Sequence, residues 1–599
     1  MTPSDHAAAP SAEPPARPAL QRALFRHRFR RLLVEMAAAV EHSALSPALS
    51  QRGELACALL DCDGYTVAEH GAALRAAAIG PQVRSALASH APLAPGQVLL
   101  VSDPQHGGTD LGTLTLIAIA IDSDGVQLGY LALSGDRGDC LRPPVGPPES
   151  QVDIDAEALP LPPAAPSPGA AEPLAELPPA VGPRYRAFHT AAATGTVGLG
   201  RRREHEGWEL PPTPLTETVA QTLAQKQRDP IAALADIKAL RGGLRLGGQH
   251  LRALDKRYGA AAIRQAMRQE LSETQAAIRV ALQRIPAGVY AFADSLDDDG
   301  VGASDLPIRA TLHLAHAPAP SRLSCDFRES AEASAGAVNT TPTVVQAAVR
   351  SALAALLPAG AAVNDGLLQG AALLLRPGSL LSAGPAHAVS GGATETALRI
   401  VDVVLGALGQ ALPQPLQAAS AGTASLLTLR APDAGSAPEG SPAPGRLYLR
   451  EPLAGGQGAR PHADGVTGRH ALGPGPRASS CELLEQRLPV RVLRCAVRSG
   501  SGGGGVRSGG DGLVRELLLL AALHVELCGD RRRRPPYGLG GGGPGQLGRD
   551  TLLRDGIERR LPPKARLLLR PGDILRTESP GGGGYGDPTR AAFYAALLS

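Results

Sequence analysis

A short glycine-containing loop holds the residues of this sequence that are best suited to catalysis. It reads Asp103-Pro-Gln-His106-Gly-Gly-Thr109 and follows a predicted strand at residues 97–102. A histidine titrates near neutral pH and can exchange a proton, and glycines let a backbone approach a bound molecule closely. Asp-Pro and Gly-Gly are also good turn formers. Because a single histidine is more often a surface residue than a catalyst, the loop indicates a candidate site without defining an activity.

Several common catalytic patterns are absent from the sequence. No lysine follows a glycine, which excludes a Walker-type phosphate loop, and there is neither a Gly-x-Ser-x-Gly nor a His-Glu-x-x-His motif. A Gly-x-Gly-x-x-Gly match at 538–543 follows no predicted strand and opens no helix, so we interpret it as a turn. We interpret the glycine run at 581–588 as a C-terminal turn packed on the core. The chain alone is therefore not expected to hydrolyse ATP.

Composition limits the classes of protein to which the chain can belong. Its 599 residues carry a formal net charge of +3, and only 3% are aromatic, so nucleic acid is not an expected partner. Seven cysteines without a Cys-x-x-Cys pair argue against a disulfide scaffold or a structural zinc site. There is no secretory signal, and the apolar runs are far shorter than the ~20 residues of a membrane span. We expect a cytoplasmic protein that does not enter the membrane.

The spacing of apolar residues predicts a mixed α/β (α+β) fold of several layers. Helical periodicity is clearest at 72–90 and 213–285, and short alternating stretches predict strands, most of them near the C-terminus. In chain order we predict a disordered leader at 1–20, an N-terminal α/β region at 21–145, a Pro/Ala-rich loop at 146–185, a central helical and α/β region at 186–425, a Gly/Pro-rich loop region at 426–480, and a β-rich C-terminal region at 481–599.

The order of motifs along residues 21–590 resembles the hydantoinase B/oxoprolinase family. No single motif is diagnostic, but the ordered set is specific. It consists of Arg52-Gly-Glu-Leu-Ala-Cys-Ala-Leu-Leu-Asp61, Asp103-Pro104 with Gly107-Gly108-Thr109, Leu296-Asp-Asp-Asp-Gly300, Asn364-Asp365-Gly366, Gly378-Ser379-Leu380, Thr394-Glu395-Thr396, Gly455-Gly-Gln-Gly458-Ala-Arg460, Arg531-Arg-Arg533, Arg570-Pro-Gly-Asp573 and the 581–588 tail.

The resemblance implies a B-type subunit of an ATP-dependent cyclic-amide hydrolase, nearest to 5-oxoprolinase. In that family an A-type partner binds ATP and Mg²⁺ and phosphorylates the amide oxygen, which turns a poor electrophile into a reactive one; the B-type subunit then completes hydrolysis of the ring. A hetero-oligomer and a role in glutathione metabolism are expected with it. Carried over by position, the resemblance implies catalytic roles for Asp103, Asp110, Asn364, Asp365 and Glu395, and substrate contacts for Gly107, Gly108, Thr109 and Arg460.

The sequence departs from the family pattern where metal-containing relatives hold a divalent cation. The family's Gly-Gly-Thr-His-x-x-Asp and His-His-x-Asp segments are replaced so that Asp110, Asp136 and Arg137 stand at histidine positions. Glu69, Asp110, Asp136 and Asp139 could form an all-oxygen site for Mg²⁺ or Mn²⁺. The interpretation that we favour is a salt-bridge network in which Arg137 neutralises these carboxylates.

Three functions stay open at this point. The first is an active B-type subunit, with catalysis resting on the residues where the pattern is intact. The second is a catalytically degenerate structural or regulatory subunit that has lost the metal site. The third is a subunit like that of acetone carboxylase, which the missing histidines disfavour because they belong to the metal site. Turn formation and helix capping are ordinary structural roles for Asp103, Asn364, Asp365 and Glu395.

Overall fold

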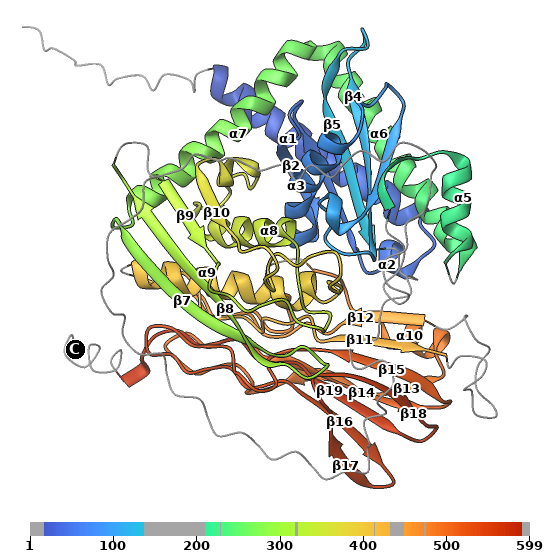
Figure 1. Cartoon of the computed structure of the whole chain (residues 1–599), viewed down its shortest axis with the longest axis vertical. Coiled ribbons are helices and arrows are strands. Elements are labelled where there is room, and N and C mark those ends of the chain that lie inside the picture. Colours follow the sequence, from blue (N-terminus) through green and yellow to red (C-terminus); the bar gives the residue numbers. More distant parts are fainter. Residues whose placement is uncertain are drawn as a thin grey trace, which may run out of the picture.

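The computed structural model describes seven stretches of the chain. They are residues 17–136, 210–227, 229–317, 322–412, 414–431, 448–472 and 475–589. The loop predicted at 146–185, Arg137 and Asp139 lie outside them, as does most of the predicted leader. The described part is a mixture of helices and four sheets, which confirms the predicted α+β fold (Figure 1). No helix within these stretches has both the length and the apolarity needed to cross a membrane.

The N-terminal layer is an antiparallel six-stranded sheet with helices on both faces and the strand order β2-β1-β5-β4-β3-β6. In β1, Leu55, Cys57 and Leu59 face the core formed with α1 and α6, whereas Ala56 and Ala58 face α3, as the two-residue alternation of a strand requires. The elements are α1 (Arg17–Ser43), α2 (Pro47–Ser50), β1 (Leu55–Leu60), β2 (Thr66–Gly71), α3 (Ala73–Ser89), β3 (Val98–Ser102), the 3₁₀ turn η1 (Pro104–His106), β4 (Thr113–Ile121), β5 (Gln127–Asp136), β6 (Leu210–Pro214), α5 (Glu217–Gln225), α6 (Pro230–Tyr258) and α7 (Ala260–Gln283).

A second layer joins this sheet to the rest of the molecule. Helix α8 packs against α3 on one side and α9 on the other, and α9 covers β7 and β8 of a four-stranded sheet ordered β10-β9-β8-β7. The elements are β7 (Gly288–Asp298), β8 (Ser304–Ala315), β9 (Arg322–Asp326), α8 (Pro342–Leu353), the 3₁₀ turns η2 (Ala354–Leu356) and η3 (Asp365–Leu368), β10 (Ala371–Leu374), the π turn η4 (Gly392–Thr396) and α9 (Ala397–Ala411).

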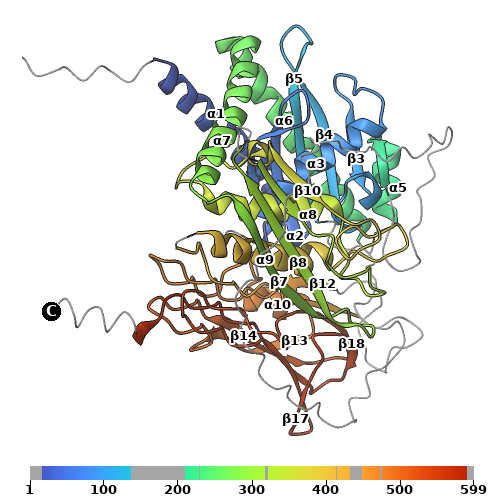
Figure 2. The ribbon, with the colours of Figure 1, turned by 60° about the vertical axis from the view of Figure 1, so that its left-hand side comes forward.

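The C-terminal part is a pair of sheets ordered β12-β11-β15-β18 and β13-β14-β19-β16-β17, which share a leucine-rich core. Figure 2 shows these orange and red strands gathered at the end of the molecule opposite the blue N-terminal sheet. The elements are β11 (Leu426–Arg430), β12 (Tyr448–Pro452), α10 (Cys481–Arg487), β13 (Val490–Arg498), β14 (Gly512–Leu519), β15 (Leu523–Cys528), β16 (Arg549–Arg554), β17 (Ile557–Arg560), β18 (Lys564–Leu569) and β19 (Ile574–Glu578).

Four glycine-rich segments, 455–458, 501–510, 538–545 and 581–586, pack backbone against backbone in this C-terminal part. Gly582 donates its N–H to the Gly510 carbonyl at 2.9 Å and accepts from Gly503 at 2.8 Å, and similar bonds link the other segments. An added Cβ would lie 1.8 Å from a carbonyl oxygen at Gly458 and 1.9 Å from one at Gly581. The runs predicted as separate turns therefore form one close-packed bundle that only glycine can build.

The element boundaries differ from the predicted ranges in three places. Helix α1 begins at Arg17, inside the predicted leader. Strand β6 and helices α5 and α6 belong to the N-terminal layer, although their sequence lies in the predicted central region. The range 426–480, predicted as a loop, includes β11 and β12. Glycine and proline dominate that range, and β11 becomes a buried strand by pairing with β15 almost 100 residues later in the chain.

Candidate functional site

The Asp103–Thr109 loop follows β3 and is held tightly against α3. Asp103 caps the turn η1, since its Oδ1 accepts the Gln105 N–H at 2.8 Å, while its Oδ2 lies 2.7 Å from His106 Nδ1. Gly107 adopts φ +83°, and a Cβ there would lie 2.8 Å from the Ser85 side chain. The loop's aspartate and histidine thus form a pair of the kind that orients an imidazole for proton transfer.

A second group of polar side chains lies where β4 begins and β5 ends. Asp110 accepts the Gly112 N–H at 2.6 Å and the Thr113 hydroxyl at 3.1 Å. Thr113 is paired with Asp136 across the sheet. Arg75, from the first turn of α3, donates to Thr113 Oγ1 at 3.0 Å and places its other nitrogen 3.9 Å from Asp136 Oδ2.

Arg450 of β12 completes this group from the C-terminal part of the chain. Its Nη1 lies 3.0 Å from Asp136 Oδ2, so it joins the N-terminal sheet to a sheet that is more than 300 residues distant in sequence. We call Arg75, Asp110, Thr113, Asp136 and Arg450 the Asp136 cluster.

Buried Glu54 adjoins the Asp136 cluster. Burial raises the pKa of Glu54, the neighbouring Arg52 opposes that rise, and the negative charge of Asp136 adds to it. Arg52 Nε lies 2.7 Å from Glu54 Oε1. A carboxyl with a raised pKa beside charged groups is a recognised feature of acid–base sites.

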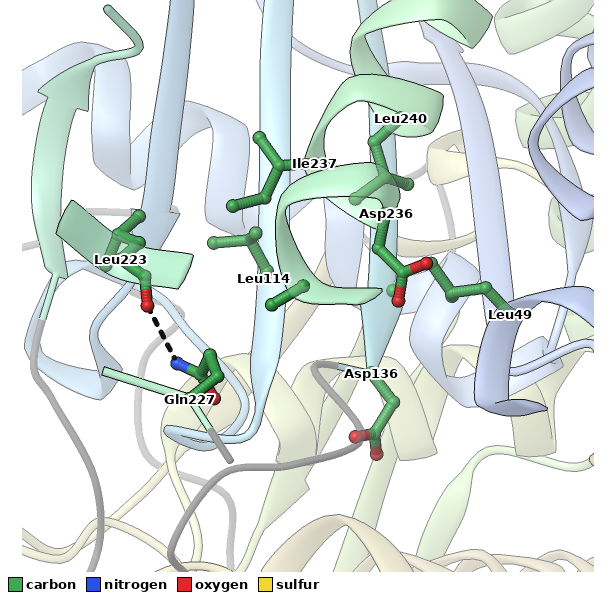
Figure 3. A pocket seen from close by; sticks show the side chains of 10 residues that line it. Leu49, Leu114, Asp136, Leu223, Gln227, Asp236, Ile237 and Leu240 are labelled. Carbon is green, nitrogen blue, oxygen red and sulfur yellow. Dashed lines mark hydrogen bonds between the residues drawn. The ribbon is translucent and has the colours of Figure 1, made fainter. Parts of the chain in front are cut away.

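A small apolar pocket adjoins the Asp136 cluster. Figure 3 shows Asp136 at one end of it, beyond the apolar side chains that meet between the sheet and α6. Of its other two labelled polar residues, Asp236 holds the turn before α2 by accepting the Leu45 and Ser46 N–H groups, and Gln227 donates to the Leu223 carbonyl. The lining residues are Leu49, Leu114, Gly135, Asp136, Leu223, Gln227, Ala233, Asp236, Ile237 and Leu240.

Two predicted catalytic residues, Asn364 and Asp365, hold the N-terminal and central layers together. Asp365 Oδ1 accepts from Arg350 at 3.0 Å, and its Oδ2 accepts from Arg84 at 2.7 Å and from the Thr66 N–H at 3.0 Å. Asn364 caps η3 and donates its amide to two backbone carbonyls. These contacts hold both residues in place between the layers, and their catalytic roles stay predictions.

Glu69, which the sequence grouped with the metal-site carboxylates, lies apart from Asp110 and Asp136. It forms an ion pair with the fully buried Arg350. Through β1, Glu69 is level with Ala132, four residues before Asp136 on β5. That offset alone is about 13 Å along the strands. Asp110 is linked to Asp136 through Thr113, and Glu69 does not join them.

The donor set of the Asp136 cluster does not fit a divalent cation. Asp136 is held by two guanidinium groups, and a metal there would place like charges in contact. Within the described stretches no group of three or more His, Cys, Asp or Glu side chains is arranged to hold a metal ion. Arg75 and Arg450 form ion pairs with Asp136, whereas the predicted network around Arg137 and Asp139 lies outside the described residues and stays a prediction.

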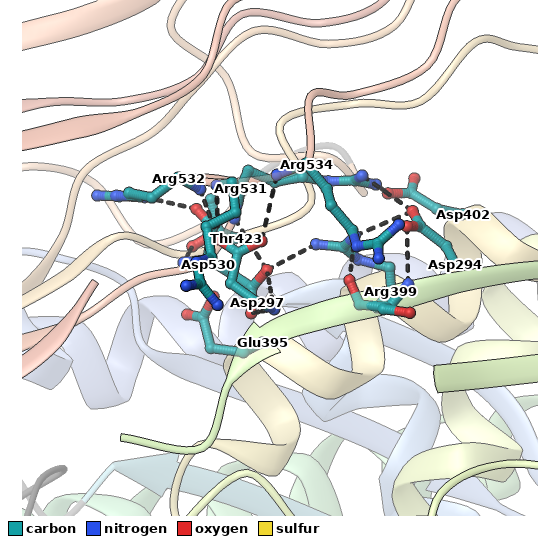
Figure 4. A network of polar contacts seen from close by, with 12 residues as sticks. Asp294, Asp297, Glu395, Arg399, Asp402, Thr423, Asp530, Arg531, Arg532 and Arg534 are labelled. Carbon is teal, nitrogen blue, oxygen red and sulfur yellow. Dashed lines mark hydrogen bonds and ion pairs between the residues drawn. The ribbon is translucent and has the colours of Figure 1, made fainter. Parts of the chain in front are cut away.

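Glu395 lies in a different, deeply buried network between the central and C-terminal layers (Figure 4). It sits in η4, where its Oε1 accepts the Ala424 N–H at 3.2 Å and its Oε2 has no hydrogen-bond partner in the described structure. Burial, reinforced by Asp530, raises its pKa to about 8. Glu395 is therefore a neutral acid at pH 7, and a π turn is a common setting for a functional residue.

Replacing Glu395 by glutamine should flatten the pH dependence of stability. The folded protein keeps the Glu395 proton up to pH 8 and the unfolded chain loses it near 4.5, so its stabilising contribution falls as pH rises through that window. Between pH 6 and 7 the wild type should lose about 1.4 kcal/mol more than Glu395→Gln. Urea unfolding of both proteins measures this difference, and Asp297, whose pKa is about 6, titrates in both. Equal slopes would contradict a buried neutral Glu395.

Other residues show where sequence reasoning was incomplete. The predicted substrate contact Arg460 lies on the exposed side of the glycine bundle, 3.4 Å from Gln417 Oε1. Gly108 donates its N–H to the Asp103 carbonyl, and the Gly108 carbonyl accepts from the Thr341 hydroxyl. Arg75 and Arg450 were not predicted at all. Neither stands in a recognisable motif, so only an alignment or the fold itself could single them out.

The described part of the chain is thus a multi-layer α+β protein with a carboxylate–guanidinium cluster beside an apolar pocket. The model of the Hydantoinase B/oxoprolinase family matches residues 19–165 and 197–588. The chain belongs to this family, as its motifs predicted.

Relatives with known names are distant but match most of the chain. It is 27% identical over 578 residues to 5-oxoprolinase 1 of Arabidopsis thaliana, covering 94% of this chain and 41% of that protein. It is 28% identical over 410 residues to the caprolactamase subunit beta of Pseudomonas jessenii, covering 65% of this chain and 68% of that subunit. The chain spans less than half the length of the 5-oxoprolinases that it matches.

Two solved structures share the fold. The crystal structure of ATP-dependent caprolactamase from Pseudomonas jessenii superposes with a TM-score of 0.75 at 20% identity, covering 97% of this chain and 93% of that one. The nucleotide-free acetone carboxylase structure also gives 0.75, at 15% identity, covering 96% and 76%. At these identities the likeness concerns the fold alone.

Proposed function

We propose that this chain is the B-type component of an ATP-dependent cyclic-amide hydrolase and acts with an A-type, ATP-binding partner. Family membership and relatives named as 5-oxoprolinases and a caprolactamase subunit support the class of reaction. The observation that carries the proposal is the Asp136 cluster, where carboxylates and guanidinium groups meet beside a small apolar pocket. 5-Oxoproline is the first substrate to test.

The chemistry of the cluster suits ring opening after activation of the carbonyl. Phosphorylation by the partner would make the ring carbon electrophilic, and water must then attack it. Arg75 and Arg450 would stabilise the negative charge that develops on the oxygen atoms. Asp136, held in orientation by both of them, would position the attacking water. The apolar side chains beside the cluster would limit competing water.

The Asp136→Asn variant should lose about 100-fold or more of ring-opening turnover, because the amide removes the charge that orients water. The assay is ATP- and Mg²⁺-dependent release of glutamate from 5-oxoproline by the co-purified A-type partner and this chain. Asp305→Asn is the matched control, since Asp305 is an exposed aspartate paired with Arg534 at the surface. Unchanged turnover in a complex of Asp136→Asn would contradict the assignment.

The second candidate is a non-catalytic subunit that stabilises its partner. The resemblance implied that Asp136 and Asp365 are metal-binding or catalytic groups. Both are instead neutralised in ion pairs, which favours this candidate. A complex that forms but opens neither 5-oxoproline, hydantoins nor ε-caprolactam would support this candidate. The acetone carboxylase alternative rests on the fold alone.

A further inference from the structure

Helix α10 lies along the edge strand β13 and brings two cysteines together. Glu485 of α10 accepts the Val492 N–H of β13 at 2.8 Å. Cys481 lies one helical turn before Glu485, and Cys495 lies three residues after Val492. Because the helix and the strand run in opposite directions, both cysteines lie on the same side of the Glu485–Val492 contact. The two thiols are close enough to interact: burial raises the pKa of Cys481, and the charge and side-chain hydrogen bond of Cys495 add to that rise.

This pair differs from the other cysteines of the described structure. Cys57, Cys325 and Cys528 are buried in the core, where burial raises the pKa of each thiol. Cys62 is exposed, but its thiol lies against the Gln127 carbonyl. Cys495 is exposed and Cys481 is partly exposed, so small reagents can reach both.

We propose that Cys481 and Cys495 form a redox site that closes as an intramolecular disulfide when a low-molecular-weight disulfide is present. One thiolate attacks the oxidant and forms a mixed disulfide, releasing one small thiol. The second thiolate then attacks the protein sulfur of that bond and releases the second small thiol. Two protein thiols become one disulfide, and the two electrons and two protons leave on the reduced oxidant.

The position of the pair connects it with the candidate site. Cys495 is paired across the sheet with Arg515 of β14, whose Nη1 lies 3.1 Å from Glu451 Oε2. Glu451 also accepts the Ser479 N–H, just before α10, and it is the immediate neighbour of Arg450. A bond between Cys481 and Cys495 would fix the start of α10 against β13, which is linked through Arg515 and Glu451 to the strand that carries Arg450.

The test is exposure of the reduced full-length chain to oxidised glutathione, followed by thiol alkylation, intact mass and peptide mapping. We expect the loss of two alkylatable thiols, a mass lower by two hydrogen atoms, and a linked peptide that joins Cys481 to Cys495, all reversed by dithiothreitol. Cys481→Ser and Cys495→Ser should each abolish the linkage, whereas Cys62→Ser should leave it intact.

Two results would overturn the proposal. One is that Cys481 and Cys495 each carry a separate glutathione adduct at completion. The other is that both remain free while Cys62 reacts. Because the readout is covalent and requires no partner or turnover, it is independent of the proposed hydrolase activity.

Discussion

Replacing Arg399 by alanine should lower the free energy of unfolding by about 3 kcal/mol. Arg399 projects from α9 with a fully buried side chain, and its two terminal nitrogens lie 2.9 Å from Asp294 Oδ2 and 2.9 Å from Asp530 Oδ1. Removing it leaves two buried carboxylates short of a partner. The loss falls at the lower end of the range for broken buried pairs, because Arg531 and Lys564 still contact them.

Urea unfolding of the purified chain measures this effect. Arg328→Ala is the control, because Arg328 pairs with Asp326 through a side chain that is 57% exposed. A solvent-exposed ion pair of this kind contributes less than about 1 kcal/mol. If the two variants lost equal stability, the buried network would not join the central and C-terminal layers as we infer.

Replacing Gly582 by alanine should destabilise the protein by at least about 3 kcal/mol, the upper end of the cost of overpacking. The new Cβ would lie 2.0 Å from the Gln457 carbonyl oxygen and 2.7 Å from the Gly458 nitrogen. Both obstacles are backbone atoms of the glycine bundle, so no side-chain rotation relieves the contact. Separating the segments would also break the hydrogen bonds that Gly582 makes to Gly503 and Gly510.

Gly504→Ala provides the matched control from the same bundle. A Cβ on Gly504 meets no atom within 4 Å, and its backbone φ lies outside the left-handed region. We expect this variant to unfold close to the wild-type urea concentration, whereas Gly582→Ala should unfold much earlier or fail to accumulate. A similar midpoint for both variants would show that the bundle tolerates expansion and that close packing does not explain its glycines.

The family and the fold class could be predicted from the sequence, because both rest on local order. Helical apolar spacing at 72–90 predicted α3, the strand predicted at 97–102 is β3, and the ordered motifs predicted membership of the family that the family model confirms. The same motifs led to Asp110 and Asp136; the sheet register pairs Asp136 with Thr113, whose hydroxyl donates to Asp110.

The partners of the charged residues could not be predicted, since the docking of distant layers decides them. Asp136 meets Arg450 from 314 residues away, and Glu69 meets Arg350 from 281 residues away. The resemblance implied the same catalytic role for Asp365 and Glu395, but their surroundings differ. Arginine side chains donate to Asp365, whereas burial raises the pKa of Glu395. The electrostatics of a carboxylate depend on what surrounds it in space, so only the tertiary structure separates structural ion pairs from the candidate site.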